Sequence, residues 1–212
     1  MIRLRSGLWA AMAASALLLQ AQPVSPKLAP GRILVATEEC HDPDFAQSVI
    51  LLVDYQEQGG VLGLMINRRT KVELARLFPE LPSSAKNRTD AVYAGGPVTL
   101  SVIGLERSRA KVEKADLVFG EVYSITDKDV LEQTASSGKP PDSFRVYVGY
   151  AGWTGPQLRG EVDRGFWHVV HGDANLIFDP HPETIWDRLN RRTQPLARAW
   201  RDVAGPMRAE LR

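Results

Sequence analysis

The stretch SVILLVDY (Ser48–Tyr55), followed by VLGLMIN (Val61–Asn67), decides the fold class of this chain. The first run is rich in β-branched residues and nearly continuous in apolar character, as is typical of a strand covered on both faces. Residues 56–60 supply a turn, so the two runs together predict a β-hairpin. Gly63 in the second run indicates a bulge or a close backbone approach. Strands that follow one another directly favour an antiparallel or mixed sheet over a doubly wound fold.

Further strands and helices are predicted on both sides of this hairpin. The clearest strand is Ser143–Tyr150, in which apolar residues on one face alternate with Arg145 and Tyr147 on the other. A turn is predicted at Trp153–Gly155, before a helix with Pro156 at its first position. The other predicted strands are 32–36, 98–105, 117–119, 121–125, 167–170 and 174–178, and the predicted helices are 71–78, 127–134, 156–164 and 183–190. The sequence therefore predicts a single α+β domain with a mostly antiparallel or mixed sheet core flanked by several helices.

The composition is that of an ordinary globular protein. Apolar residues make up 44% and charged residues 24% of the 212 residues, close to the globular average. A chain of this length buries roughly 70% of its unfolded surface, so it needs no metal or disulfide to fold. Cys40 is the only cysteine in the sequence, which excludes an internal disulfide. The formal charge is +1, so no global field attracts nucleic acid or an anionic membrane.

The first 22 residues have the layout of an export signal. Arg3 and Arg5 form a basic start, and Leu8–Leu19 is an uncharged, mostly apolar stretch. At about 1.5 Å per helical residue this stretch is too short to cross a hydrocarbon core of about 30 Å, so no stable membrane span is expected. Export to the periplasm is therefore predicted for residues 1–22, with 23–30 as a Pro-rich linker. The alternatives are an uncleaved anchor, or a start codon assigned too early on a cytoplasmic protein.

Four segments between residues 31 and 190 carry a family pattern. Each places glycine or polar residues beside an apolar run, and they read GRILVA (31–36) with D-P-x-F-x-x-S-V (42–49), GLMINR (63–68), VYAGGPV (92–98), and GYAGW (149–153) with Gln157, Leu158, Glu161 and Trp167, continued by LIFD (176–179) and Trp186. In combination and order these motifs resemble the YqgE/AlgH family. The resemblance covers residues 31–190 and leaves 191–212 as an Arg-rich C-terminal tail.

The resemblance implies an α+β domain with a complex, mostly antiparallel sheet, but it implies no activity. Members of the family are usually described as transcriptional regulators without a known biochemistry, and most look cytoplasmic. This chain departs from the pattern in its leader, in its tail, in Arg69 where proline is common, and in Tyr55 where histidine is common. The leader puts a direct transcriptional role in doubt, because an exported protein does not meet the chromosome.

The sequence offers little for catalysis or metal binding. Neither the nucleophile-elbow pattern G-x-S-x-G nor C-x-x-C is present. Cys40 and His41 are adjacent, but neighbouring residues of an extended chain point to opposite sides, which disfavours a thiolate–imidazole pair. His168 and His171 are three positions apart, so they do not face one metal ion from a strand. We therefore expect no catalytic residue, no metal and no cofactor.

The segment Gly149–Gly155 is the leading alternative as a small-ligand site. It is glycine-rich, it follows a strand, and it precedes the helix predicted from Pro156. Its backbone N–H groups predict an anion nest for a phosphate or nucleotide-like ligand, or an enzyme site, with Arg68 as a charge clamp. The same residues also fit a structural interpretation, in which the glycines serve core packing and Arg68 pairs with an acid such as Glu161.

The Arg-rich end of the chain is the remaining basic feature. Residues 188–212 hold seven arginines against two acids, a composition suited to phosphate contacts. Pro195 and the Gly205-Pro206 pair interrupt the segment, and no helix-turn-helix pattern fits. Nucleic acid is therefore not the expected partner, above all if the chain is exported. A solvated tail or an exported interaction module are the alternatives.

The leading hypothesis is a non-catalytic binding or regulatory protein whose partner is an unidentified protein or small molecule. Its surface is expected where the ends of the family segments meet, since loops and strand ends on a rigid scaffold often carry sites. The candidate residues are Asp42, Asn67, Arg68, Gly95, Gly96, Tyr150, Gly152 and Gln157.

Overall fold

The computed structural model describes residues 27–78 and 89–193. The predicted leader (1–22), part of the predicted linker and the tail beyond residue 193 lie outside the described residues, so the expectations for them stay predictions. Leu28, within the segment predicted as linker, is 3% exposed and packs into the core. No helix within the described ranges is long and apolar enough to cross a membrane.

Four antiparallel strands build one end of the sheet. β1 (Arg32–Ala36) lies between β10 (Trp167–His171) and β2 (Val49–Tyr55), and β2 pairs with β3 (Gly60–Met65). The predicted hairpin is therefore confirmed, with both strands within two residues of their predicted bounds. The predicted strands at 32–36 (β1) and 167–170 (β10) are also confirmed. They pair with each other although they lie far apart in the sequence.

The β2–β3 hairpin contains the predicted irregularity. Its register shifts between Leu52 and Asp54, and Leu52 stands opposite Gly63. A Cβ atom on Gly63 would lie 2.5 Å from the Ile50 side chain and 3.2 Å from the Trp153 ring. Gly63 therefore marks a bulge and a close approach at once, because a larger residue would displace the apolar side chains packed over it.

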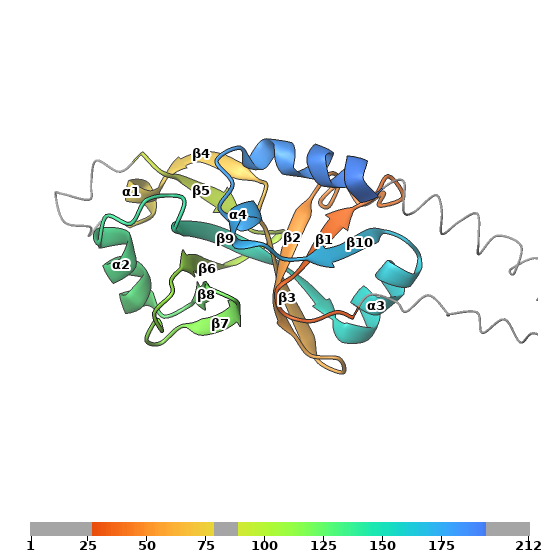
Figure 1. The fold of residues 1–212 in the computed structure, drawn as a ribbon, viewed down its shortest axis with the longest axis horizontal. Helices are drawn as coiled ribbons and strands as arrows, with labels where there is room; N and C mark the ends of the chain where they lie inside the picture. The colour runs from red at the N-terminus through yellow and green to blue at the C-terminus, as the bar shows by residue number, and fades with distance from the viewer. Residues whose placement is uncertain (1–26, 79–88, 194–212) are drawn as a thin grey trace, which may run out of the picture.

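β9 (Phe144–Thr154) joins this end of the sheet to the other. Its last residues pair with β3, and its residues from Phe144 to Tyr150 pair with β6. Figure 1 shows β9 running across the molecule between the two ends. The strands at the second end, in chain order, are β4 (Arg69–Glu73), β5 (Ala91–Ala94), β6 (Val98–Arg107), β7 (Asp116–Phe119) and β8 (Val122–Ile125). The β6–β8–β7 path is antiparallel, whereas β5 pairs with β9 in parallel, so the sheet is mixed as predicted.

Short helices cover both faces of the sheet (Figure 1). α3 packs Leu158 against one face of β1–β3, and α4 packs Ile177 against the opposite face. The helices are α1 (Leu74–Leu77), α2 (Lys128–Ser136), α3 (Gly155–Asp163), α4 (Ala174–Ile177), a 3₁₀ turn at Pro182–Thr184, and a helix over residues 185–193. Asp127 caps α2 by accepting from the Val130 N–H at 3.1 Å.

The core consists of three connected apolar clusters. The largest joins both ends of the sheet and includes Tyr93, Tyr147 and Ile177. A second cluster lies beneath α3 and contains Trp153 and Trp167. A third lies beneath α1 and α2 at the other end. A single α+β domain with a mixed, mostly antiparallel sheet is therefore confirmed.

The predicted helix 71–78 is mostly wrong. Arg69–Glu73 forms strand β4, and only Leu74–Leu77 is helical. The strand forms because β5 offers it an edge, so that Arg69 stands opposite Tyr93 and Glu73 stands opposite Ala91. Pairing with a distant strand outweighs the local helical pattern, which the sequence window alone does not reveal.

Two further predictions fail near the C-terminal motifs. The predicted strand 174–178 contains helix α4, whose first turn is capped by Asp173 accepting from the Asn175 N–H at 2.9 Å. A short apolar run does not distinguish a buried strand from a buried helix. The predicted turn at Trp153–Gly155 is also wrong, because β9 continues to Thr154 in register with Gly60, and α3 follows at once.

Candidate functional site

Two glycine motifs cross each other in the middle of the molecule. Gly95 makes backbone hydrogen bonds to neighbours on both sides, each 2.8 Å long. A Cβ atom on Gly95 would lie 2.1 Å from the Gly149 carbonyl oxygen, and one on Gly96 would lie 2.1 Å from the Tyr150 carbonyl carbon. Gly149 also has a φ of +76°, a conformation that glycine adopts without strain. These glycines therefore let two backbones touch, and protein atoms fill the space between them.

Asn67 and Arg68 hold the loop 42–48 against the end of β3. The Asn67 Oδ1 atom accepts from the Val49 N–H, and its Nδ2 atom donates to the Gln47 carbonyl oxygen, both at 2.9 Å. The Arg68 Nη2 atom donates to two carbonyl oxygens of the same loop, at 3.1 and 3.0 Å. Asn67 thus bonds the end of the loop that leads into β2. Both side chains are used to fix a loop.

The predicted pairing of Arg68 with Glu161 is wrong, because Glu161 has other partners. Its carboxylate accepts from the indole N–H of Trp153 at 3.0 Å and from that of Trp167 at 2.9 Å. The Gln157 side-chain amide donates to it at 3.1 Å. Trp153 is 6% exposed and Trp167 is 3% exposed, so both tryptophans belong to the core. Glu161 accepts hydrogen bonds from their buried indole N–H groups.

Phe45 and Cys40 complete this aromatic cluster from the loop. The Phe45 ring lies 5.5 Å from the Trp153 ring and 5.6 Å from the Trp167 ring. Burial raises the pKa of the Cys40 thiol, a backbone hydrogen bond from Asp42 lowers it, and the Asp42 carboxylate raises it further. A thiol whose pKa is raised forms little thiolate at neutral pH. The geometry therefore gives Cys40 a packing role.

The start of α3 does not form the predicted anion nest. The Gly155 N–H donates to the Gly59 carbonyl oxygen at 2.9 Å. Pro156 has no N–H, and the Gln157 N–H donates to the Thr154 Oγ1 atom at 3.2 Å. The first three positions of the helix thus have no free donor for an anion.

The structure brings most of the predicted site residues together. Asn67, Arg68, Gly95, Gly96 and Tyr150 meet around the backbone crossing, linked by the Ala94 N–H donating to the Arg68 carbonyl oxygen at 2.9 Å. Asp42 belongs to the loop that Arg68 holds, Gly152 lies beside the Tyr150 ring, and Gln157 lies apart on α3. Their contacts are intramolecular, and their role in binding a partner stays a prediction.

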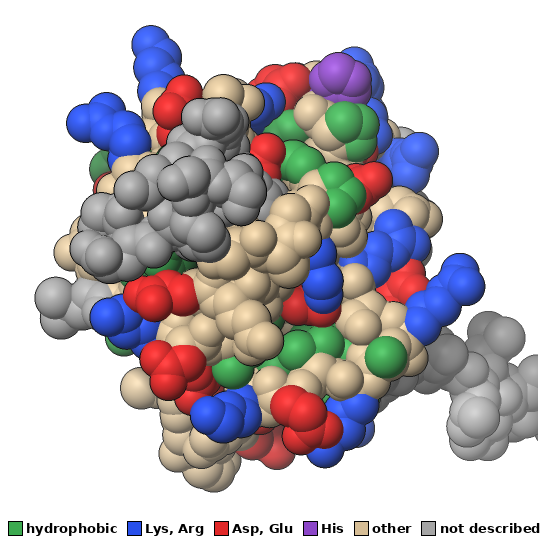
Figure 2. Space-filling model, turned by 90° about the vertical axis from the view of Figure 1, so that its left-hand side faces the viewer, with side chains coloured by type: hydrophobic (Ala, Val, Ile, Leu, Met, Phe, Trp, Pro, Cys, Tyr) green, Lys and Arg blue, Asp and Glu red, His purple; other side chains and the backbone are tan. Residues whose placement is uncertain are grey.

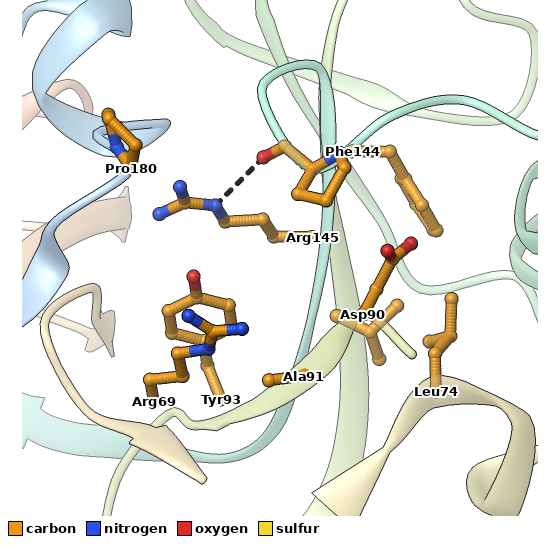
Figure 3. Close-up of a pocket in the computed structure, with 10 residues that line it drawn as sticks. Arg69, Leu74, Asp90, Ala91, Tyr93, Phe144, Arg145 and Pro180 are labelled. Carbon is orange, nitrogen blue, oxygen red and sulfur yellow. Dashed lines mark hydrogen bonds between the residues drawn. The ribbon is translucent and has the colours of Figure 1, made fainter. Parts of the chain in front are cut away.

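A pocket opens instead where β5 diverges from β9. The two strands pair only at Tyr93 and Ala94, so within the described residues Phe144–Val146 has no strand partner on that side. The pocket has a volume of about 200 Å³. Its charged and polar lining residues are Arg69, Asp90, Tyr93 and Arg145, and the remaining lining is apolar (Figure 3).

Arg145 is the most unusual residue of this pocket, because it is only 5% exposed. Its guanidinium donates to the carbonyl oxygens of Pro141 at 3.0 Å, Ile177 at 2.9 Å and Asp179 at 2.6 Å. It also lies 4.9 Å from the centre of the Tyr93 ring. None of these partners is a carboxylate. Within the described part of the chain, carbonyl dipoles, ring faces and the neighbouring Tyr147 hydroxyl compensate this buried positive charge.

Two tyrosines lie beside this guanidinium. The rings of Tyr93 and Tyr147 are 5.3 Å apart, and the fully buried Tyr147 hydroxyl has the Arg145 guanidinium as its polar neighbour. Burial raises the pKa of both phenols, and the charge of Arg145 opposes that shift in each. Both hydroxyls therefore stay protonated at physiological pH. Figure 3 shows the Tyr93 hydroxyl pointing toward the side of the pocket where the Arg145 guanidinium lies.

The outer face of this end carries mixed charges. Figure 2 shows Lys and Arg side chains interspersed with Asp and Glu, without one large patch of a single sign. Arg69, at the pocket, is exposed. Selection of a charged ligand would therefore come from the pocket itself and not from a wider surface field.

Sequence reasoning placed Arg145 and Tyr147 on one face of a strand but did not identify a pocket there. The available signal was an arginine in the middle of an apolar strand, which is costly to bury without a partner. Its environment depends on Ile177 and Asp179, which follow it by more than thirty positions in a segment whose structure was predicted wrongly. In the described residues, no group of three or more His, Cys, Asp or Glu side chains is arranged to hold a metal ion.

Comparison with known proteins gives consistent results. A family model described as AlgH-like matches residues 33–197. A UPF0301 protein of Streptomyces coelicolor is 34% identical over 76% of this chain and 85% of its own length. A UPF0301 protein of Ralstonia nicotianae is 35% identical over 75% of this chain and 85% of its own length.

Solved structures agree with the same assignment. The solution structure of the AlgH protein from Pseudomonas aeruginosa is similar with a TM-score of 0.64 and 34% identity, over 82% of this chain and 91% of that one. The crystal structure of a protein from Corynebacterium diphtheriae has a TM-score of 0.64 and 25% identity, over 78% of this chain and 87% of that one. The names of these relatives state no ligand or reaction.

Proposed function

The chain belongs to the AlgH-like family, and we propose that this member is a non-catalytic binding protein that takes a small anion in the pocket between β5 and β9. The observation that carries the proposal is the buried Arg145 guanidinium, which has three carbonyl acceptors and no carboxylate partner in the described residues. A buried charge is expensive unless an opposite charge accompanies it. An anionic ligand would supply that charge.

The donors of the pocket support this proposal. A guanidinium has five N–H groups, and three of those of Arg145 are used by the carbonyl oxygens of Pro141, Ile177 and Asp179. The Tyr147 hydroxyl is a polar neighbour of the same guanidinium, and the Tyr93 hydroxyl and the exposed Arg69 side chain lie in the pocket lining. These groups match the acceptor-only character of a carboxylate or phosphate.

No arrangement for chemistry accompanies these donors. Among the described residues, the pocket lining contains no cysteine, serine or histidine, and Asp90 is its one carboxylate. A nucleophile paired with a base, which covalent catalysis needs, is therefore missing from the lining. Binding without turnover is the function that this geometry supports best.

Calorimetric titration of the full-length chain with acetate, isovalerate and inorganic phosphate, at fixed ionic strength, tests the proposal. We expect saturable binding of at least one anion, weakened roughly three- to tenfold by Arg69→Ser and by Tyr93→Phe. Arg68→Met is the matched control, because the Arg68 guanidinium also binds carbonyl oxygens but faces the loop 42–48. Absence of binding by all three anions, or equal losses in the control variant, would contradict the proposal.

We further propose that binding takes place after export, as the leader predicted at residues 1–22 suggests. Cell fractionation followed by N-terminal sequencing tests this step. A periplasmic chain beginning near Gln22 would support export and remove a direct transcriptional role. An intact cytoplasmic chain would overturn export and restore regulation at the chromosome as an alternative, with the anion as a possible effector.

A further inference from the structure

The pocket between β5 and β9 has walls of two kinds. Arg69, Tyr93 and the Arg145 guanidinium supply donors, whereas Leu74, Ala91, Phe144, Val146, Pro141 and Pro180 supply apolar surface. In Figure 3 the Arg145 guanidinium and the Tyr93 hydroxyl lie on one side, and Leu74, Phe144 and the Asp90 carboxylate lie on the other. A ligand that fits both sides has an anionic end and an apolar end.

The size of the pocket limits the apolar end. A volume of about 200 Å³ corresponds to roughly seven water molecules at about 30 Å³ each. A nucleotide is several times larger than this space. The volume instead suits a molecule with about seven non-hydrogen atoms, such as a carboxylic acid with a short aliphatic chain.

The charge of the lining favours a monoanion over phosphate. Among the described residues, two arginines and one aspartate line the pocket, a balance of one positive charge. A carboxylate carries one negative charge and places both oxygens at one end, whereas a phosphate would direct oxygens toward apolar walls without partners. The Arg145 guanidinium and the Tyr93 hydroxyl can each donate to an oxygen of one carboxylate.

We propose that the ligand is a short-chain aliphatic monocarboxylate, bound with its carboxylate at Arg145 and Tyr93 and its chain against Phe144, Val146 and Leu74. This inference rests on the proposed anion-binding function and specifies its ligand class. It also gives a reason for the open edge of β9 at Phe144–Val146, since the apolar side chains there would be covered by the ligand and not by another strand.

The test compares four probes on the full-length chain by calorimetry: isovalerate, acetate, inorganic phosphate and isoamylamine. Isovalerate should bind about tenfold or more tightly than acetate, because its additional carbons are buried. It should also bind more tightly than phosphate, and isoamylamine, which has the same apolar chain with a positive end, should not bind. This pattern would support both the ligand class and the anion site.

The other outcomes separate the two proposals. Phosphate or acetate binding as tightly as isovalerate would overturn the ligand class and leave the anion site standing. Binding of none of the anions, or tighter binding of isoamylamine, would overturn both, the latter because Asp90 would then dominate the pocket.

A variant pair places the bound chain. Ala91→Val fills part of the pocket. It should weaken the affinity for isovalerate about tenfold or more and leave the affinity for acetate nearly unchanged. Ala110→Val adds the same atoms at an exposed position outside the pocket lining and should change neither affinity. Equal isovalerate affinity in wild type and Ala91→Val would overturn the assigned position of the chain, and with it this inference.

Discussion

The two halves of β9 differ in how completely their surroundings are filled. From Gly149 onward the strand is crossed by Gly95 and Gly96 so closely that a single added carbon would overlap backbone atoms. From Phe144 to Val146 the same strand borders a pocket of about 200 Å³ and a buried guanidinium without a carboxylate partner. The glycine motifs, which resemble a ligand-binding loop, are filled by protein backbone. The segment Phe144–Val146, which resembles an ordinary core strand, borders a cavity.

This difference teaches that glycine density alone does not identify a binding site in this fold. Glycines are required where backbones touch, and that requirement is structural. A site needs volume and uncompensated polar groups together. In the described residues, the N-terminal half of β9 has both, whereas the C-terminal half has neither at its glycines. Substitutions in the C-terminal half of β9, where backbones touch, should therefore reduce stability more than substitutions at the pocket beside the N-terminal half.

Gly96→Ala should have the largest effect, because its Cβ would lie 2.1 Å from the Tyr150 carbonyl carbon and neither backbone can move without breaking strand pairing. We expect a loss of at least about 3 kcal/mol in the free energy of unfolding, or failure to fold. Urea denaturation measures it. Gly60→Ala is the matched control, since nothing lies within 4 Å of its Cβ position, and it should stay within about 0.5 kcal/mol of wild type. Similar stabilities for the two variants would show that the crossing is not rigid.

Glu161→Ala should destabilise the closed half by about 2 kcal/mol, because it leaves the buried indole N–H groups of Trp153 and Trp167 without an acceptor. The same denaturation series measures the change, and tryptophan fluorescence reports the altered environment. Asp163→Ala, an exposed acid at the end of the same helix, serves as control. A loss in the control as large as that in Glu161→Ala would attribute the effect to helix charge and not to the indole donors.

The third prediction concerns pH and the segment that Arg145 holds. Burial acts to raise the pKa of Asp179, but hydrogen bonds from Arg188 and the His181 N–H outweigh it and hold that pKa below its ordinary value. A carboxyl whose folded pKa is lowered stabilises the fold above its unfolded pKa of about 3.9 and loses that contribution as the pH falls through the folded value.

Wild type should therefore exceed Asp179→Asn in stability at pH 7, and the difference should vanish in strong acid. Because Arg188 is 41% exposed, we expect a difference of no more than about 1 kcal/mol. Denaturation at a series of pH values measures it, and an Arg188→Met background should reduce it. A difference that is the same at pH 7 and in strong acid would contradict the assigned cause.

Ala91→Val should have the smallest effect on stability, because the added methyl groups enter the pocket and valine suits a strand. We expect a change within about 0.5 kcal/mol, measured by urea denaturation. The contrast with Gly96→Ala is the direct comparison between the two halves of β9. A loss of several kcal/mol here would mean that the pocket is closed in solution.

The sequence predicted the fold class and most strands, because alternation and β-branched runs report burial locally. The hairpin β2–β3 and the helix starting near Pro156 followed from such local signals. The elements that were wrong, at 71–78 and 174–178, have ambiguous local patterns that a distant neighbour resolves. Arg69–Glu73 forms a strand because it pairs with β5, which lies too far along the sequence to influence a local pattern.

The sequence by itself determined one globular α+β domain, its family, and the positions of its glycine-rich junctions. Only the tertiary structure decided that Arg68 fixes a loop, that Glu161 serves two indoles, and that β5 leaves β9 early enough to open a pocket at Arg145. The physical reason is that local patterns encode which residues are buried, whereas a cavity and an uncompensated charge depend on which distant segments fail to meet.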